Sequence, residues 1–361
     1  MARESAKLSP VRSGKKSAGR VGSVSDFRGG LGPRMRALAA SFALLCGALA
    51  VPAIAQQPIP LRLGFNANSA RNIGEVPNRI AERNGFFARE GLAVTMVPLQ
   101  GTTHMVAALD RGEVDVTGTA SPYMIEAALH GSDAVAVIGG VANTIYSLIG
   151  KPEIKRIGDL KGKVVALSAP PDTITLSTKM LLAKGGLNDG DYRTKEIIGS
   201  SQRGACLSSG VCDAVPLGQP DDIVFARKGF VKLGDSLQVV PNLQFNVIAA
   251  RRSFAAAHEQ TMVALARAFA ATFRFLRDPA SRDAAVQAIV ETTGADEAVA
   301  RAVLALYYEP DRGVMPKEGE INMSGMAAVI ALLGAAGRIS GPLPPAERFV
   351  DLRYLHAAGL Q

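Results

Sequence analysis

The sequence of 361 residues contains no tryptophan, six tyrosines, four histidines and three cysteines. Sugar-binding sites use flat aromatic side chains as stacking platforms, so the missing tryptophan disfavours a sugar ligand. The histidines are scattered, and no Cys/His combination has the spacing of a zinc site. We therefore expect no metal and no cofactor. The four histidines are His104, His130, His258 and His356.

Signatures of several enzyme classes are also missing. The chain has no G-x-S-x-G nucleophile elbow, no P-loop and no dinucleotide-binding glycine fingerprint in a strand–turn–helix context. One apolar run, residues 37–51, is short for a membrane span, and no later run is long enough to be one.

That apolar run fits an export signal instead. Met35 and Arg36 precede it, and an Ala-x-Ala pattern ending at Ala55 follows it. A charged start, an apolar core and a small-residue cleavage site are typical of a secretory signal peptide. We therefore expect a signal peptide at 35–55, cleavage after Ala55 and a periplasmic protein; the alternative is a buried core helix.

The basic character of the chain is confined to its N-terminus. Residues 1–34 are polar and rich in Gly and Ser, which predicts disorder, and we hypothesise that translation starts at Met35. Residues 1–36 contain nine Lys/Arg and two Asp/Glu, which leaves the remaining chain a net charge of +1 out of the formal +8. A nearly neutral chain gives no argument for nucleic-acid binding, and we expect no such partner.

Beyond Ala55, strand-like and helix-like runs alternate. The runs "LRLGFN" and "LAVTMVPL" read as strands, and "GEVPNRIAERNG" reads as a helix that ends at Asn84-Gly85. This alternation predicts an α/β fold with mainly parallel sheets. From about Ser253 the pattern is mostly helical, as in "AAHEQTMVALARAFAATFRFLRD".

One segment of the chain occurs twice, ninety-eight positions apart. Residues 101–122 read "GTTHMVAALDRGEVDVTGTASP" and residues 199–220 read "GSSQRGACLSSGVCDAVPLGQP", with six identities and no gap. Each copy predicts a helix that begins with two hydroxyl residues, ends at Gly and leads into a strand. Hydroxyl side chains can cap a helix N-terminus, and that end attracts an anionic or acceptor group.

The repeat carries a prediction about ligand binding. In open α/β sheets, ligands bind where strands end and helices begin. Two copies therefore predict two edges of one ligand cleft, with Thr102-Thr103 on one edge and Ser200-Ser201 on the other.

Two cysteines, Cys206 and Cys212, lie in the second copy, where they align with Ala108 and Val114. We expect both to face the interior. Their six-residue spacing leaves two states open, a disulfide across the helix–strand turn or two buried free thiols.

Five segments together resemble the nitrate/sulfonate/taurine-type periplasmic binding proteins of ABC importers, a group with relatives that handle thiamine precursors. They read "NRIAERNGFFAREGLAV", "AALDRGEVDV", "IGDLKGKVVAL", "SSGVCDAV" and "ARKGFVKLGD". The resemblance covers about Leu61 to Leu355. It implies a two-lobed type II periplasmic-binding-protein fold, with lobes at 58–143 plus 247–361 and at 144–246, joined by two hinge crossings.

The resemblance also implies which loops face the ligand. Most of their side chains are neutral hydrogen-bonding groups, which suit selective capture of a polar molecule. Arg71 is the preferred partner for a carboxylate or sulfonate, with a solvated arginine as the alternative. Arg203 is a weaker second candidate, and Asp172 also suits an N-cap. The expected ligand-binding set is Asn66, Asn68, Arg71, Thr102, Thr103, Ser121, Pro122, Asn143, Thr144, Tyr146, Ser168, Asp172, Thr173, Ser200, Ser201, Gln219 and Asn246.

The function implied is that of an exported, monomeric solute-binding protein. It would capture a small polar, anionic organic molecule (a sulfonate, carboxylate or pyrimidine-like compound) and deliver it to an ABC permease in the inner membrane. Two alternatives stay open. One is an enzyme on the same fold, although the cysteine-rich iron motif of thiamine-pyrimidine synthases and the first-lobe cysteine nucleophile of desulfinases are both missing. The other is a ligand sensor for a membrane receptor.

Overall fold

The computed structural model describes residues 57–143, 145–308 and 314–360. The expected signal peptide, residues 1–34 and Thr144 lie outside the described residues.

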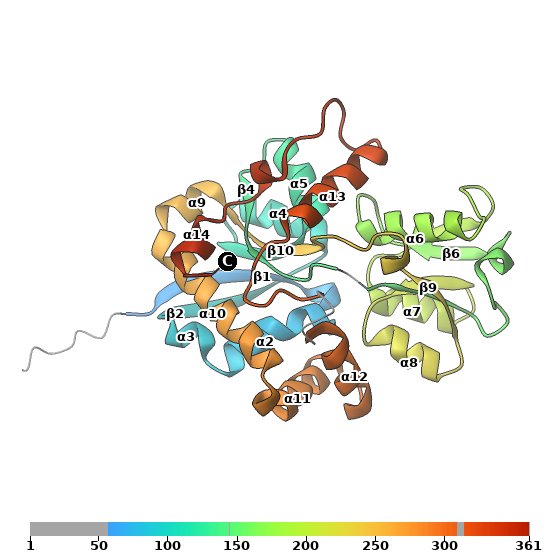
Figure 1. Ribbon diagram of the computed structural model, residues 1–361, viewed down its shortest axis with the longest axis horizontal. Coiled ribbons are helices and arrows are strands. Elements are labelled where there is room, and N and C mark those ends of the chain that lie inside the picture. The colour runs from blue at the N-terminus through green and yellow to red at the C-terminus, as the bar shows by residue number, and fades with distance from the viewer. Residues whose placement is uncertain (1–56, 144, 309–313, 361) are drawn as a thin grey trace, which may run out of the picture. The chain divides into compact units, whose positions relative to one another are not determined.

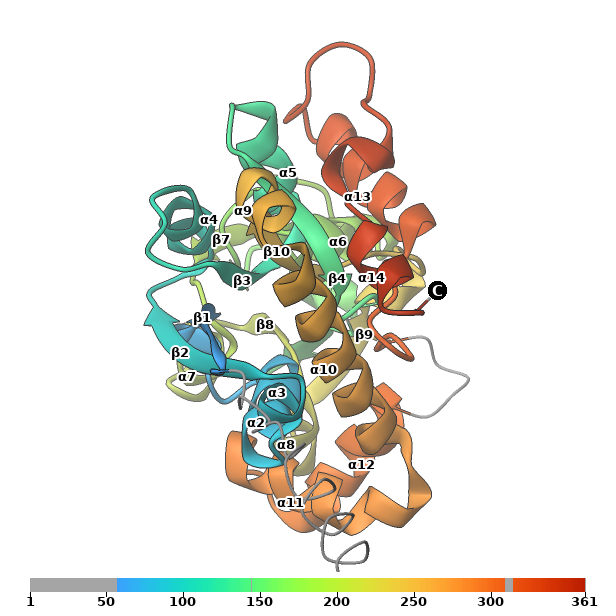
Figure 2. The same cartoon turned by 90° about the vertical axis from the view of Figure 1, so that its left-hand side faces the viewer.

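The described chain forms two five-stranded sheets with the same topology (Figures 1 and 2). The first sheet has the order β2-β1-β3-β10-β4, and the second has the order β7-β6-β8-β5-β9. In each sheet one strand, β10 or β5, is antiparallel to both of its neighbours, and the other pairs are parallel. Four of the five strands in each sheet therefore run in the same direction, which confirms the prediction of an α/β fold with mainly parallel sheets. The strands are β1 (Ile59–Asn66), β2 (Leu92–Leu99), β3 (Val116–Ala120), β4 (Ala134–Gly139), β5 (Ser147–Gly150), β6 (Val164–Leu167), β7 (Arg193–Glu196), β8 (Ala214–Leu217), β9 (Val231–Asp235) and β10 (Asn246–Arg251).

Helices cover both sheets, and the C-terminal part of the chain is mostly helical, as expected. Three helices belong to the second sheet: α6 (Thr173–Lys184), α7 (Ser200–Ser208) and α8 (Asp221–Arg227). The others are α2 (Val76–Arg83), α3 (Phe86–Arg89), α4 (Thr102–Asp110), α5 (Ser121–Leu129), α9 (Arg252–Ala257), α10 (Glu259–Arg277), α11 (Arg282–Thr293), α12 (Glu297–Tyr308), α13 (Met323–Ala335) and α14 (Arg353–Ala357).

The longest of these helices, α10, shows why the tail returns to the first sheet. Its buried apolar residues Met262, Leu265, Phe269, Phe273 and Leu276 recur every three or four positions, which gives one apolar face. That face packs on α2, α3 and β2, with an edge-to-face contact between Phe269 and Phe87. In Figure 2, α10 runs across the molecule beside α2 and α3.

The chain passes between the two sheets twice, at residues 140–146 between β4 and β5, and at residues 236–245 between β9 and β10. Buried apolar residues form one core around the first sheet and two smaller clusters around the second. Both passages are short compared with the segments they connect.

The two copies of the repeat fold alike. Helices α4 and α7 each have nine residues and begin after a glycine with positive φ, 85° at Gly101 and 98° at Gly199. After each helix an aspartate accepts a 2.8 Å hydrogen bond from a backbone N–H on the neighbouring strand: Asp115 from Arg62 and Asp213 from Val164. The predicted repeat of structure is confirmed.

The expected hydroxyl caps are wrong. Glycine occupies the N-cap of both helices, and neither helix has a side-chain cap. Thr102 and Ser200 are already the first helical residues, so their hydroxyls are one position too late to cap. The prediction that Asp172 caps α6 is confirmed, because its carboxylate accepts from the N–H of Ile174.

Cys206 and Cys212 form a disulfide with a Cα–Cα distance of 5.3 Å. Both residues are buried, as predicted. The sequence left a disulfide and two free thiols as alternatives, and the structure has the disulfide. It links α7 to Cys212, which directly precedes Asp213 and the start of β8.

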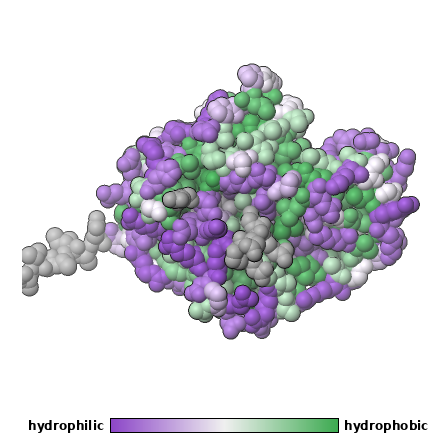
Figure 3. Space-filling model, viewed as in Figure 1, coloured by the Kyte–Doolittle hydropathy of each residue, from purple (hydrophilic) through white to green (hydrophobic). Residues whose placement is uncertain are grey.

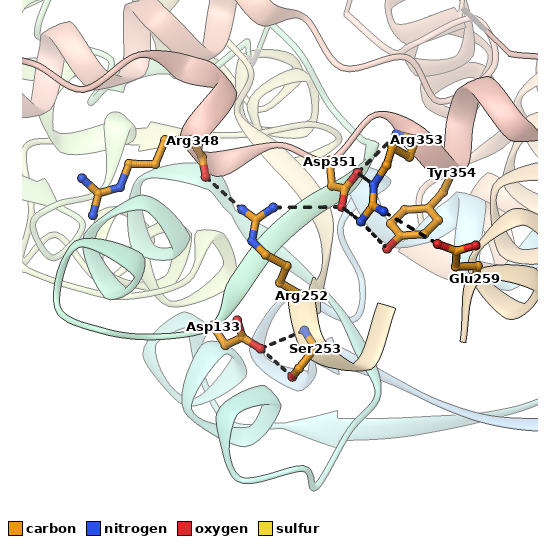
Figure 4. Close-up of polar contacts among 8 residues, drawn as sticks. All are labelled: Asp133, Arg252, Ser253, Glu259, Arg348, Asp351, Arg353 and Tyr354. Carbon is orange, nitrogen blue, oxygen red and sulfur yellow. Dashed lines mark hydrogen bonds and ion pairs between the residues drawn. The ribbon is translucent and has the colours of Figure 1, made fainter. Parts of the chain in front are cut away.

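A cluster of arginines and carboxylates holds the C-terminal segment (Figure 4). Arg353 donates to both oxygens of buried Asp351 at 3.0 and 2.8 Å, and it also lies 3.7 Å from Glu259 at the start of α10. Arg252, the first residue of α9, donates to the carbonyl of Arg348 at 3.0 Å. The hydrogen bonds from Arg353 lower the pKa of Asp351, although burial opposes them. The segment is thus fixed to α9 and α10.

The surface in Figure 3 is mostly hydrophilic, with apolar residues gathered near α5 and α13. No helix in the described part of the chain has the length and hydropathy of a membrane span. Within the same residues, no group of three or more His, Cys, Asp or Glu side chains could hold a metal ion.

Candidate ligand-binding site

A cavity of about 120 Å³ lies between residues of the first sheet and residues of the second. On one side it is bounded by the ends of β1 and β3, the start of β10 and the first turn of α4. On the other side it is bounded by the loop after β6 and the first turns of α6 and α7. We call it the cleft cavity. It is lined by Asn66, Asn72, Gly74, Glu75, Thr102, Met105, Gly118, Thr119, Ala120, Tyr146, Ser168, Asp172, Ile174, Ile198, Gly199, Ser200, Arg203, Phe245 and Asn246.

Arg203 is the positive charge of the cleft cavity. The side chain comes from the first turn of α7 and is 1% exposed. Its Nε donates to the carbonyl of Pro216 at 2.7 Å, and Nη1 donates to the carbonyl of Ile197 at 3.1 Å. Among the described residues no carboxylate lies within ion-pair distance. Burial lowers the pKa of the guanidinium, although nearby Tyr146 and Asp172 oppose that effect.

Two asparagines add amide donors on the opposite wall. The side-chain oxygen of Asn66 accepts from the N–H of Asn68 at 3.0 Å, and that of Asn72 accepts from the N–H of Gly74 at 2.9 Å. Each oxygen is therefore engaged in its own tight turn. The NH₂ groups are left as the hydrogen-bonding atoms that Asn66 and Asn72 can offer to a ligand.

Two carboxyl groups also line the cleft cavity. Asp172 accepts hydrogen bonds from Ile174 and from the Ser168 hydroxyl, but its burial outweighs them and raises its pKa. The surface of Glu75 is partly accessible through the cavity, yet its carboxyl is surrounded by protein. Burial raises the pKa of Glu75 to about 7, against a hydrogen bond from Asn78 that lowers it. The cavity therefore offers one cation and two carboxyl groups whose pKa values are raised by burial.

The predicted site residues fall into two groups. Seven of them line the cleft cavity: Asn66, Thr102, Tyr146, Ser168, Asp172, Ser200 and Asn246. Ser200 also accepts a hydrogen bond from the N–H of Gly218 at 3.1 Å, so part of its bonding capacity is used within the second sheet.

The other predicted residues lie elsewhere. Arg71 donates to the carbonyl of Thr293, Ser121 donates to the carbonyl of Gln244, and Asn143 accepts from the N–H of Leu243. Gln219 lines a different cavity. Outside the cleft lining are also Asn68, Thr103, Pro122, Thr173 and Ser201.

That other cavity is larger, about 690 Å³, and mostly apolar. Its buried carboxylate, Asp222, already accepts from the Ser147 hydroxyl, from Gln219 and from the N–H of Ile223. Gln219 in turn accepts a 2.6 Å hydrogen bond from Tyr307. The polar groups there satisfy one another, so the smaller cleft cavity has the better chemistry for a polar ligand.

Three polar residues of the cleft cavity were missed or ranked low from the sequence: Asn72, Glu75 and Arg203. A signal existed for Arg203, which occupies the position of Met105 in the repeat and lies three residues after Ser200 on the same helix face. Both Met105 and Arg203 line the cavity. The sequence holds no comparable signal for Glu75, which reads as an ordinary acidic residue at a helix start.

Comparisons with known proteins give a family and a fold. The family model described as "NMT1/THI5 like" matches residues 75–280. No curated protein sequence matches the chain. The alkanesulfonate-binding protein SsuA from Xanthomonas axonopodis pv. citri, solved with MOPS, is 18% identical with a TM-score of 0.63; the match covers 81% of this chain and 99% of that one.

Two further solved structures share the fold. The periplasmic nitrate-binding protein NrtA from Synechocystis PCC 6803 is 14% identical, with a TM-score of 0.64, and the match covers 78% of this chain and 82% of that one. The desulfurization enzyme DSZB is also 14% identical, with a TM-score of 0.61 and coverage of 83% and 98%. The fold thus occurs in binding proteins and in an enzyme.

Proposed function

Because the chain belongs to the NMT1/THI5-like family, we propose that it is a periplasmic solute-binding protein that captures a small anionic organic molecule for an ABC importer. The cleft cavity is the proposed binding site, and the passages at 140–146 and 236–245 are the proposed hinges. Sulfonate- and nitrate-binding proteins among its structural neighbours support this class of function.

One observation carries the proposal: the buried guanidinium of Arg203 is held by two carbonyls and has no ion-pair partner among the described residues. Asp172 and Asp221 act on this charge only from beyond ion-pair distance. A buried charge without a direct counter-charge is costly, and an anionic group in the cavity would compensate it. The amides of Asn66 and Asn72 and the N-terminus of α4 supply further donors on the opposite wall. An anion would therefore touch both sheets and stabilise the closed cleft.

The proposal makes the protein a carrier and not an enzyme. DSZB shares the fold, so the fold alone does not decide between the two. In the described residues, both cysteines are joined in a disulfide and neither offers the thiolate that a cysteine nucleophile requires. We further propose that the exported protein is a monomer and that an inner-membrane permease is its partner.

Native mass spectrometry tests the function directly. Protein is exported to the periplasm, purified without added ligand, and measured under native and denaturing conditions. We expect an N-terminus at Gln56, a monomer mass, and a small anionic molecule that is lost on denaturation. Ethanesulfonate, propionate and nitrate are then titrated by calorimetry. Chemical conversion of a bound molecule, or binding of neutral compounds in preference to all three anions, would overturn the proposal.

A further inference from the structure

A second, smaller cavity of about 40 Å³ adjoins the cleft cavity on the side of the first sheet. We call it the recess. The two cavities share Gly74, Glu75, Gly118 and Asn246 as lining residues. Glu75 is the one residue with a charge in this shared set, so its carboxyl group belongs to the junction of the two cavities.

The charged side chains of the cleft cavity do not balance one another. Among the described residues that line it, Arg203 is the one cation, whereas Glu75 and Asp172 are both carboxylic acids. With both carboxyl groups ionised, the negative charges would outnumber the positive one. Charges interact strongly in a buried site, so a ligand that brings a further negative charge would be repelled. The proposed capture of an anion therefore requires that one carboxyl group be neutral when the ligand is bound.

Glu75 is the carboxyl group that loses its charge at the lower cost. Asp172 accepts hydrogen bonds from the N–H of Ile174 and from the Ser168 hydroxyl, and both favour its ionised form. It also occupies the N-cap of α6, where a negative charge is favoured. Glu75 accepts one hydrogen bond, from Asn78 at 2.8 Å, and no other described group donates to its carboxyl.

The recess contains a buried acceptor without a donor. Oδ1 of Asn246 has no hydrogen-bond partner among the described residues. It faces Gly140 in the wall of the recess, because a β-carbon at Gly140 would collide with it. Unpaired buried acceptors are costly and rare in native proteins. An ionised carboxylate only accepts hydrogen bonds, whereas a protonated one has an O–H that donates. Protonation of Glu75 thus adds a donor to the wall that holds this acceptor.

We propose that Glu75 takes up a proton when the cleft cavity takes up its anionic ligand, so that anion and proton are captured together and released together. The proton comes from the solvent and converts the carboxylate of Glu75 to a carboxylic acid, which leaves Arg203 to face the anion. This inference rests on the proposed anion capture and adds its regulation by pH. By linkage, the anion raises the proton affinity of Glu75 by the same factor as the proton raises the affinity for the anion.

The other charged groups near Glu75 come from four helices. They are Arg79 on α2, Arg282, Asp283 and Glu291 on α11, which packs against the turn Ile73–Glu75, and Asp172 on α6 and Arg203 on α7 across the cleft cavity. Glu291 is paired with Arg83, and Asp283 with Arg301. The residues of β3, β10 and α10 that line the recess are uncharged.

The pairing of anion and proton has a pH signature. Burial raises the pKa of Glu75 to about 7, against Asn78 and Arg79, which lower it. The carboxyl group is neutral below this pH, so the affinity for an anion should be highest there and fall as the pH rises through the pKa. Between pH 6 and pH 8 the neutral fraction falls about tenfold, and the affinity should fall by the same factor.

Calorimetry on the exported protein tests the proposal with ethanesulfonate, because a sulfonate stays ionised throughout this pH range. Titrations in Tris and in triethanolamine, which differ in ionisation enthalpy, give the number of protons taken up from the difference in heat. We expect about one proton per bound ethanesulfonate at pH 8, far fewer at pH 6, and binding about tenfold weaker at pH 8 than at pH 6.

Two variants assign the proton to Glu75. Glu75→Gln replaces the carboxyl group by a permanently neutral one, so it should take up no proton and bind ethanesulfonate about tenfold more tightly than the wild type at pH 8. Glu82→Gln, exposed on α2, is the matched control and should behave as the wild type does. Asn78→Ala removes the donor that favours the ionised carboxylate, so the fall in affinity should shift to higher pH. This second variant keeps the test informative if Glu75→Gln folds poorly.

The outcomes separate the two proposals. Ethanesulfonate that binds at pH 8 without proton uptake would overturn the pairing while anion capture stands. Proton uptake that survives Glu75→Gln, or an unshifted pH dependence in Asn78→Ala, would overturn it in the same way. If ethanesulfonate, propionate and nitrate all fail to bind at pH 6 at millimolar concentration, the proposed function and the pairing both fail.

Discussion

Arg203 Nε donates to the carbonyl of Pro216 at 2.7 Å, so a fully buried guanidinium is fixed by the backbone of β8. Its counterpart in the first copy of the repeat is Met105, which lines the same cavity from the other side. The two copies thus share a backbone conformation, but the same position lining the cavity is methionine in one copy and arginine in the other. That difference gives the second copy a buried cation where the first copy has an apolar thioether side chain.

Replacement of Arg203 by methionine should abolish most anion binding. Loss of hydrogen bonds to a charged group costs about 1.5–3 kcal/mol, or roughly 10- to 150-fold in affinity. The free energy of unfolding should change little, because removal of a buried cation offsets the loss of the donor to the carbonyls of Pro216 and Ile197. Calorimetric titration with ethanesulfonate and a urea melt measure the two effects. Arg71→Met is the control, because Arg71 lies outside the cleft cavity. Equal losses in the two variants would contradict the assignment.

Two neighbouring tyrosines on α12 form a natural pair for testing the contact with the second sheet. Tyr307 donates to the buried Oε1 of Gln219 at 2.6 Å, while the equally buried hydroxyl of Tyr308 has no partner within residues 57–143, 145–308 and 314–360. Tyr307→Phe leaves a buried acceptor unsatisfied and should lower the free energy of unfolding by about 1–3 kcal/mol. Tyr308→Phe should change it by less than about 0.5 kcal/mol. Urea denaturation of both variants makes the comparison, and a reversed order would refute it.

The repeat shows what the sequence could predict. The matched spacing of Gly101, Gly112 and Asp115 with Gly199, Gly210 and Asp213 predicted two equal helix–strand units, because glycine and aspartate have local roles that spacing reveals. The hydrogen-bond partners of individual side chains could not be predicted in this way. Arg71 looked like an anion binder, yet it donates to the carbonyl of Thr293, 222 positions away. No local pattern reports such a contact.

Glu75 illustrates the same limit at the site itself. An acidic residue before a helix is ordinarily solvated, and nothing in "GEVPNR" distinguishes this one. The small cavity that Glu75 lines is bounded by residues of β3, β10 and α10, whose positions depend on the whole first sheet. The alternation of strand-like and helix-like runs therefore predicted the α/β scaffold, and the repeat predicted two edges of one cleft, whereas the polarity of the cleft depends on long-range packing.

The repeated aspartates predict a loss of stability in acid. Burial alone would raise the pKa of Asp115, but hydrogen bonds from Arg62 outweigh it and the pKa lies below its usual value; Lys151 and Val164 do the same for Asp213. A depressed carboxyl pKa stabilises the folded state above about pH 4, and that contribution is lost as the pH falls through the folded pKa.

Asp115→Asn should lower the free energy of unfolding by about 1–3 kcal/mol at pH 7 and should weaken its decline at acid pH. Urea melts from pH 2 to 7 measure it. Exposed Asp283→Asn is the control, and parallel curves for Asp115→Asn and the wild type would reject the account.

The disulfide can be tested against the repeat itself. In the first copy, Ala108 and Val114 occupy the places of Cys206 and Cys212, and both are fully buried. The double change Cys206→Ala and Cys212→Val therefore installs side chains that this backbone already accommodates. Any loss of stability then reports mainly the missing cross-link.

For the short loop between positions six apart, that loss should be about 2 kcal/mol. Reduction of the wild type with a phosphine should produce the same shift in a urea melt and leave the double variant unchanged. Unreduced, denatured wild type should titrate with no free thiol in the exported chain. Two free thiols, or a reduced wild type as stable as the oxidised one, would show that α7 and β8 do not depend on the bridge. The position of Arg203 would then rest on its hydrogen bonds to Pro216 and Ile197 alone.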